Sequence, residues 1–93
     1  MSETIVIGPR PGLAEAEQLL DTLRALPPEG EVTFDAAAVE SLPAACALVI
    51  AAFARHRPET APKPRVRAPS REFVDAFSDL GLFQDLMKME FGK

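Results

Sequence analysis

Histidine and cysteine, two residue types that often carry catalysis, each occur once in this chain, as His56 and Cys46. His56 stands between Arg55 and Arg57 in the sequence. No nucleophile or orienting acid lies close to it in the sequence, as a general base would need. We therefore expect His56 to be a solvent-exposed histidine at a helix end.

Cys46 is flanked by Ala44, Ala45 and Ala47, which predicts a buried structural thiol. A single cysteine cannot form an internal disulfide, and one cysteine with one histidine is too few for a metal site. The five glycines are scattered and form no phosphate-binding loop. The carboxylates fall mostly on solvent faces of predicted helices. We therefore expect no catalytic residues, no metal and no cofactor, so that the protein is not an enzyme.

The charge distribution limits the class of partner. A net charge of −4 argues against nucleic-acid binding, which needs a basic surface. One segment, 55–71, departs from this balance because Glu59 is its only acid. Its cations are Arg55, Arg57, Lys63, Arg65, Arg67 and Arg71. This segment is either a solvated helix end and loop or a basic rim that meets an acidic partner.

Apolar periodicity and turn signals predict alternating strands and helices. Strands are predicted over 4–8, 31–34 and 65–68, and helices over 13–26, 42–57 and 71–80. Ser70 is a predicted helix cap and Gly81 a predicted left-handed stop, whereas the type of segment 82–91 stays open. This alternation predicts a single α/β domain over 1–93, with a mainly parallel sheet of about four strands and helices packed on it.

The two later helices are predicted to bury apolar stripes. The helix over 42–57 places Pro43 in its first turn, where proline is tolerated, and should be deeply packed. The inward residues are expected to be Cys46, Val49, Ile50 and Phe53 in this helix, and Phe73, Val74, Phe77 and Leu80 in the last one.

No stretch has the roughly 18 apolar residues of a membrane-spanning helix. The longest apolar run, 42–54, is too short, and no signal peptide is recognisable. We expect a cytoplasmic protein without direct membrane insertion.

Two segments together carry a family resemblance. Asp35 ends a predicted strand and is followed by a connection and the apolar helix 47–53. Farther on, Ser70 begins a helix that ends in Leu80-Gly81-Leu82-Phe83. This ordered combination resembles the bacterial STAS family of anti-sigma factor antagonists. The chain starts directly on its first predicted strand, so we expect the leading strand of the family's N-terminal hairpin to be missing.

The resemblance implies a protein-binding role in partner switching. In the family, an Asp-Ser-Ser/Ala-Gly motif opens the apolar helix, and its serine is phosphorylated by a partner kinase that is itself the anti-sigma factor. At the family's spacing this motif falls on Pro43, Ala44, Ala45 and Cys46. Ala44, at the phosphoacceptor position, has no hydroxyl group, so the switch is expected to be silent. A shifted alignment makes Ser41 the alternative phosphoacceptor.

We therefore expect a non-catalytic regulatory module that binds an anti-sigma factor or a histidine-kinase-like ATPase, including one of the chemotaxis type. The expected partner-binding residues are Ser41, Leu42, Pro43, Ala44, Ala45, Ala47 and Leu48. An accessory STAS subunit of an ABC-type lipid transport complex, bound to the transporter ATPase, is the alternative. A small-ligand binder or enzyme is a third possibility.

Overall fold

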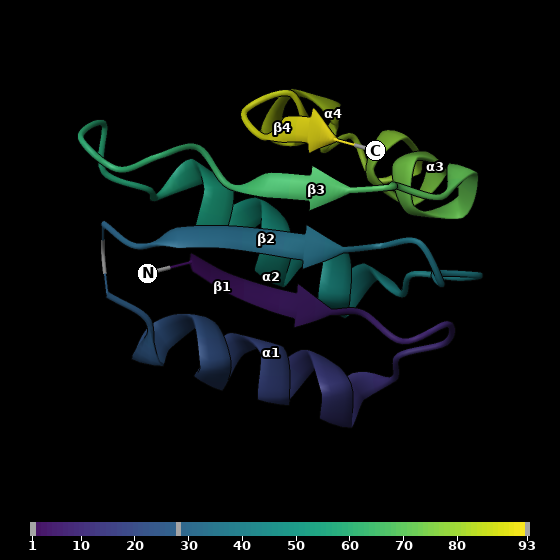
Figure 1. Ribbon diagram of the computed structural model, residues 1–93. Helices are drawn as coiled ribbons and strands as arrows, with labels where there is room; N and C mark the ends of the chain where they lie inside the picture. Colours follow the sequence, from purple (N-terminus) through teal and green to yellow (C-terminus); the bar gives the residue numbers. More distant parts are fainter. Residues whose placement is uncertain (1, 28, 93) are drawn as a thin grey trace.

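Strands and helices alternate along the part of the chain that the computed structural model describes, residues 2–27 and 29–92 (Figure 1). The elements are β1 (Ser2–Val6), α1 (Leu13–Ala25), β2 (Glu31–Asp35), α2 (Ala44–Arg55), β3 (Arg65–Arg67), α3 (Arg71–Asp79), α4 (Phe83–Leu86) and β4 (Glu90–Gly92). The predicted α/β class and the parallel sheet of about four strands are confirmed.

The sheet has the order β1-β2-β3-β4, and each neighbouring pair is parallel. Because every crossover steps in the same direction and such crossovers are right-handed, the helices gather on one face. Figure 1 shows α2 behind the sheet and α1 below it, beyond β1. The open face carries Thr33, Arg65 and Glu90 in register, and Arg65 pairs with Glu90 at 3.5 Å. This polar surface can therefore face water.

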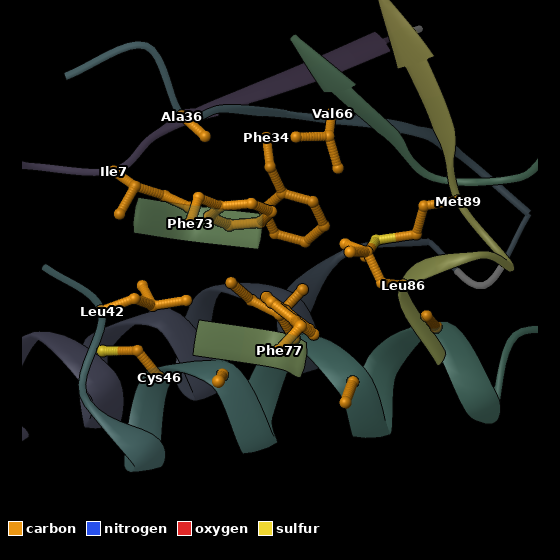
Figure 2. Packing of buried hydrophobic residues seen from close by; sticks show 14 of the residues in the cluster. Ile7, Phe34, Ala36, Leu42, Cys46, Val66, Phe73, Phe77, Leu86 and Met89 are labelled. Atoms are coloured by element: carbon orange, nitrogen blue, oxygen red, sulfur yellow. The ribbon is translucent and has the colours of Figure 1, made fainter. Parts of the chain in front are cut away.

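The core lies between the sheet and the helices (Figure 2). Phe34 of β2 and Val66 of β3 are completely buried at the centre of the sheet. Ile50 of α2 packs in the same cluster as Phe73 and Phe77 of α3, whose ring centroids lie 5.0 Å apart. Bulky rings from a short helix thus fill the space above the alanine-rich α2.

The boundaries of several elements differ from the prediction. β1 ends at Val6, and the predicted helix over 42–57 begins only at Ala44, because Pro43 is an extended N-cap residue. Leu42 lies outside the helix but is buried. β3 ends before Ala68, which has a positive φ of 48°.

The predicted inward stripes are partly wrong. Cys46, Ile50, Phe73 and Phe77 are buried as expected, and the half-buried Val49, Phe53 and Val74 pack against the core. Leu80 is instead 42% exposed, because it caps the end of α3. The open segment 82–91 forms the short helix α4 and then enters β4, and it adds Leu86 and Met89 to the core.

Among residues 2–27 and 29–92, no helix is both long and apolar enough to cross a membrane.

Candidate docking site

The connection from β2 to α2 is held rigidly against the loop that follows β1. The backbone N–H groups of Glu40 and Ser41 both donate to the carbonyl of Pro9, at 2.8 and 3.1 Å. Arg10 also pairs with Glu40 at 3.2 Å, although both side chains are exposed. The start of α2 is therefore presented from a fixed loop at the carboxyl-terminal edge of the sheet.

Asp35, the strand-end acid of the resemblance, organises the start of this connection. Its carboxylate accepts a hydrogen bond from the backbone N–H of Ala37 at 3.1 Å. The Arg67 side chain on the neighbouring strand donates to the same carboxylate at 3.2 Å. Asp35 thus stabilises the turn and joins β2 to β3.

The first turns of α2 expose small and apolar side chains. Ala44 is the first residue of the helix and is exposed, and Leu48, one turn later on the same side, is 53% exposed. Pro43 precedes them as the N-cap. A helix start without acceptor side chains or acids leaves its N–H groups open to water or to a partner.

A shallow hollow of about 360 Å³ lies between this helix start and α3. Its apolar part is formed by Leu42, Ala44, Ala76 and Leu80, and its acidic part by Glu72, Asp75 and Asp79. We call this the α2–α3 hollow. Arg71 pairs with Asp75 at 3.6 Å, so one of the three acids is partly neutralised.

The structure divides the predicted partner-binding residues into two groups. Ser41, Ala44 and Leu48 are exposed, and Pro43 and Ala45 are half-buried. The other two, Leu42 and Ala47, are buried in the core and support the surface from beneath. Of the two phosphoacceptor positions considered, Ala44 lies in the α2–α3 hollow, whereas Ser41 lies in the preceding loop.

The acidic side of the hollow was not anticipated from the sequence. Glu72, Asp75 and Asp79 follow the spacing i, i+3, i+7 within the predicted helix, which places them on one face. That signal was present, but it only gains meaning once α3 is known to lie beside the start of α2.

The basic segment 55–71 is largely paired within the molecule. Arg55 binds Asp85 through two hydrogen bonds of 3.2 and 2.7 Å. Arg57 donates to the carbonyl of Gly30, and its guanidinium lies 5.1 Å from the ring centre of Phe53. Three further pairs are Arg65 with Glu90, Arg67 with Asp35 and Arg71 with Asp75. Apart from Arg71, whose partner lies in the same helix, these arginines link separate parts of the fold, which favours the first interpretation of the segment.

Cys46 and His56, the two residues first considered for catalysis, have no catalytic partner in the interactions that the structure shows. The Cys46 thiol is buried, and its sulfur lies 3.9 Å from the carbonyl of Gly12. Burial, together with the negative charge of Glu15, raises the pKa of this thiol. His56 is exposed at the C-cap of α2, as expected. Within the described ranges, no three His, Cys, Asp or Glu residues gather as a metal site would require.

Comparisons with known proteins give no relative for this chain. A scan against protein-family models, a search of the curated proteins and a search of the solved structures each return no match.

Proposed function

We propose that this protein is a non-catalytic, STAS-like regulatory module that binds another protein through the start of α2 and the adjoining face of α3. The observation that carries the proposal is the position of Ala44. This residue, which the resemblance aligns with the phosphoacceptor, is exposed and lines the α2–α3 hollow. The exposed Leu48 lies one turn away.

The architecture supports binding by surface contact. In open α/β sheets, ligands bind where the strand order reverses direction. The four described strands follow a single order with no reversal, and so they create no such crevice. The α2–α3 hollow is shallow and combines apolar and acidic residues. A protein surface that offers an apolar side chain surrounded by Lys or Arg would complement it.

The missing hydroxyl group at Ala44 supports a silent switch. A phosphate at this position would add negative charge next to Glu72, Asp75 and Asp79, and so would change the docking surface strongly. With alanine there, the surface keeps one charge state. The protein would then remain permanently competent to bind its partner.

The partner we propose is an anti-sigma factor or a histidine-kinase-like ATPase, and both proteins would meet in the cytoplasm. An ATPase of an ABC-type lipid transporter is the alternative partner. Nothing in the geometry of the hollow favours the transporter ATPase, so the experiment below includes it as a competing outcome.

The test combines complex formation with intact-mass analysis. The chain is mixed with ATP and, in parallel samples, with the kinase-like ATPase or anti-sigma factor encoded nearest to its gene and with an ABC-type transporter ATPase. Each mixture is separated by size-exclusion chromatography. We expect a complex and no gain of 80 Da, the mass of one phosphoryl group. The variant Ala44→Ser is the matched control, because it restores a hydroxyl group at the same position.

Three results would count against the proposal. Phosphate on wild-type Ser41, lost in Ser41→Ala, would move the switch to the preceding loop. A stable complex with a transporter ATPase, in place of the kinase-like protein, would support the alternative. The absence of any complex with either class of ATPase would remove the binding role.

A further inference from the structure

The strand β1 forms one free edge of the sheet. The N–H of Ile7 donates to the carbonyl of Asp35 at 3.0 Å, which fixes the direction in which alternate backbone groups point. In a parallel pair, odd-numbered residues of this segment therefore face β2. The N–H and C=O groups of Thr4 and Val6 point to the open side, where no other described strand lies (Figure 1).

This edge has little of the usual protection against pairing. Natural sheets block their edges with charged side chains, above all lysine, or with proline, bulges or a covering segment, and the one charged residue of β1 is Glu3. β1 spans five residues, Ser2–Val6, and contains neither lysine nor proline. Its last residue, Val6, is 71% exposed although it is β-branched and apolar. The opposite edge, β4, is only three residues long.

A hollow of about 420 Å³ lies along β1 and α1. Ile5 and Ile7 line it from the strand side, and Gln18, Leu19 and Thr22 line it from α1. If one more strand paired with β1, its helix-facing side chains would lie over these residues. The hollow therefore has space for side chains of an added strand.

The side of α1 that lines this hollow carries little free charge. Gln18, Leu19 and Thr22 are uncharged. Glu15, the acid that α1 contributes there, accepts a hydrogen bond of 2.7 Å from the backbone N–H of Gly12. The α1 sides of two such hollows can therefore approach each other without strong charge repulsion.

We propose that two copies of this chain associate through their β1 strands, which pair antiparallel around a two-fold axis at Ile5. In this register Ile5 of one copy lies opposite Ile5 of the second copy, and Thr4 lies opposite Val6 of the second copy. Thr4 and Val6 are the residues with free backbone groups, so they form the hydrogen-bonded pairs on each side of the axis. The two sheets become one continuous sheet.

The side chains favour a second copy as the occupant, because the register is self-complementary. β-branched residues face each other across the strands, which stabilises antiparallel pairs. The single charge of β1, Glu3, lies opposite Ile7 of the second copy and does not meet its own equivalent. If the pairing of the two β1 strands shifted by one residue, the helix-facing side chains of one copy would turn to the other face of the sheet. The alternation of side chains along β1 therefore selects this register.

Cysteine crosslinking tests the register directly. In a Cys46→Ala background, Ile5→Cys places two thiols on the two-fold axis, where opposite Cα atoms of a non-hydrogen-bonded pair are about 4.5 Å apart. That spacing permits a disulfide. With oxidised glutathione as oxidant, we expect a covalent dimer to form roughly tenfold or more faster than for Val6→Cys or the exposed control Leu13→Cys.

Sedimentation velocity over a concentration series provides the second measurement. We expect the wild-type chain to shift from monomer to dimer as its concentration rises. Val6→Lys, which adds a charge at the exposed edge without touching the core, should stay monomeric. Leu48→Lys is the matched control and should still dimerise, because Leu48 belongs to the docking surface on α2.

The dimer is excluded if the wild-type chain stays monomeric at every concentration, or if Ile5→Cys crosslinks no faster than Leu13→Cys. Dimerisation that Val6→Lys leaves unchanged would also exclude it, because the contact would then lie elsewhere. None of these outcomes bears on partner binding at the α2–α3 hollow, so the two proposals fail separately.

Discussion

At the scale of single residues, the pair between Arg55 and Asp85 shows how charges connect parts of this fold. Asp85 belongs to the short helix α4, and its side chain is only 9% exposed, whereas the side chain of Arg55 is 53% exposed. Hydrogen bonds from Arg55 are the main cause that lowers the pKa of Asp85. The pair therefore attaches α4 to the end of α2.

We expect the two partners to respond unequally to substitution. Asp85→Asn leaves an exposed arginine that water can solvate, and should lower the free energy of unfolding by about 1 kcal/mol. Arg55→Met should cost more, because it leaves a buried carboxylate without its partner. Urea denaturation near neutral pH measures both values. Equal losses for the two variants would contradict this asymmetry.

The same pair predicts a dependence of stability on pH. Because the pKa of Asp85 is lower in the folded state, the unfolded chain takes up its proton first as the pH falls. The stabilising contribution is complete above the ordinary aspartate pKa of about 3.9 and is lost as the pH falls through the lower folded value. The difference in Tm between wild type and Asp85→Asn should therefore shrink as the pH falls below about 4. A difference that stays constant would exclude this coupling.

Cys46 is expected to react only when the protein opens. Its thiol is buried, and its raised pKa reduces the reactive thiolate further. Labelling with a chromogenic disulfide reagent should be slow in buffer and should rise in parallel with the unfolding transition in denaturant. Rapid labelling of the folded chain would show that the start of α2 opens locally.

At the scale of secondary-structure elements, α3 is defined by the residues at its two ends. The Ser70 hydroxyl oxygen accepts a hydrogen bond from the N–H of Phe73 at 3.1 Å, which starts the helix. At the other end, Gly81 has a φ of +73°, and the N–H of Leu82 donates to the carbonyl of Phe77 at 2.8 Å. This stop directs the chain into α4.

Gly81→Ala should lower the free energy of unfolding by about 1 kcal/mol, because a side chain is strained at positive φ. Gly8→Ala is the matched control. At both positions an added Cβ meets open space, but only Gly81 has a positive φ. Thermal denaturation of the two variants separates strain from packing. A loss at Gly8 as large as at Gly81 would show that strain is not the cause.

Element types and caps could be predicted from the sequence because their signals are local. Ser70 and Gly81 act as expected, and the parallel sheet predicted from the alternation of strands and helices is present. The fate of segment 82–91 could not be predicted, because β4 is only three residues long and depends on pairing with β3. The exposure of Leu80 was not predicted either, because it depends on where α3 ends: Leu80 is the C-cap residue of the helix.

The proposed docking surface could also be predicted only in part from the sequence. The start of α2 could be located from the resemblance, and the acidic spacing on α3 was visible in the sequence. That Ala44 and Asp79 line the same hollow follows from how α2 and α3 pack, and no local sequence pattern encodes this arrangement.

At the scale of the whole molecule, the two proposed surfaces lie on different sides of one two-layer domain. β1 forms one edge of the sheet, and α3 lies beyond the carboxyl-terminal end of β3, near the opposite edge (Figure 1). A dimer through β1 would therefore keep both α2–α3 hollows accessible. Such a dimer would present two docking surfaces to partners, which raises the effective affinity for a partner that is itself dimeric.

The most direct test of the central claim is the affinity of two leucine variants for the kinase-like partner, measured by titration calorimetry. Leu48 on α2 and Leu13 on α1 are 53% and 68% exposed, so glutamate at either position leaves the core intact. Docking through α2 predicts that Leu48→Glu weakens binding by about 30-fold, or about 2 kcal/mol, whereas Leu13→Glu binds like the wild type. Equal affinities for the two variants would contradict the proposed docking surface.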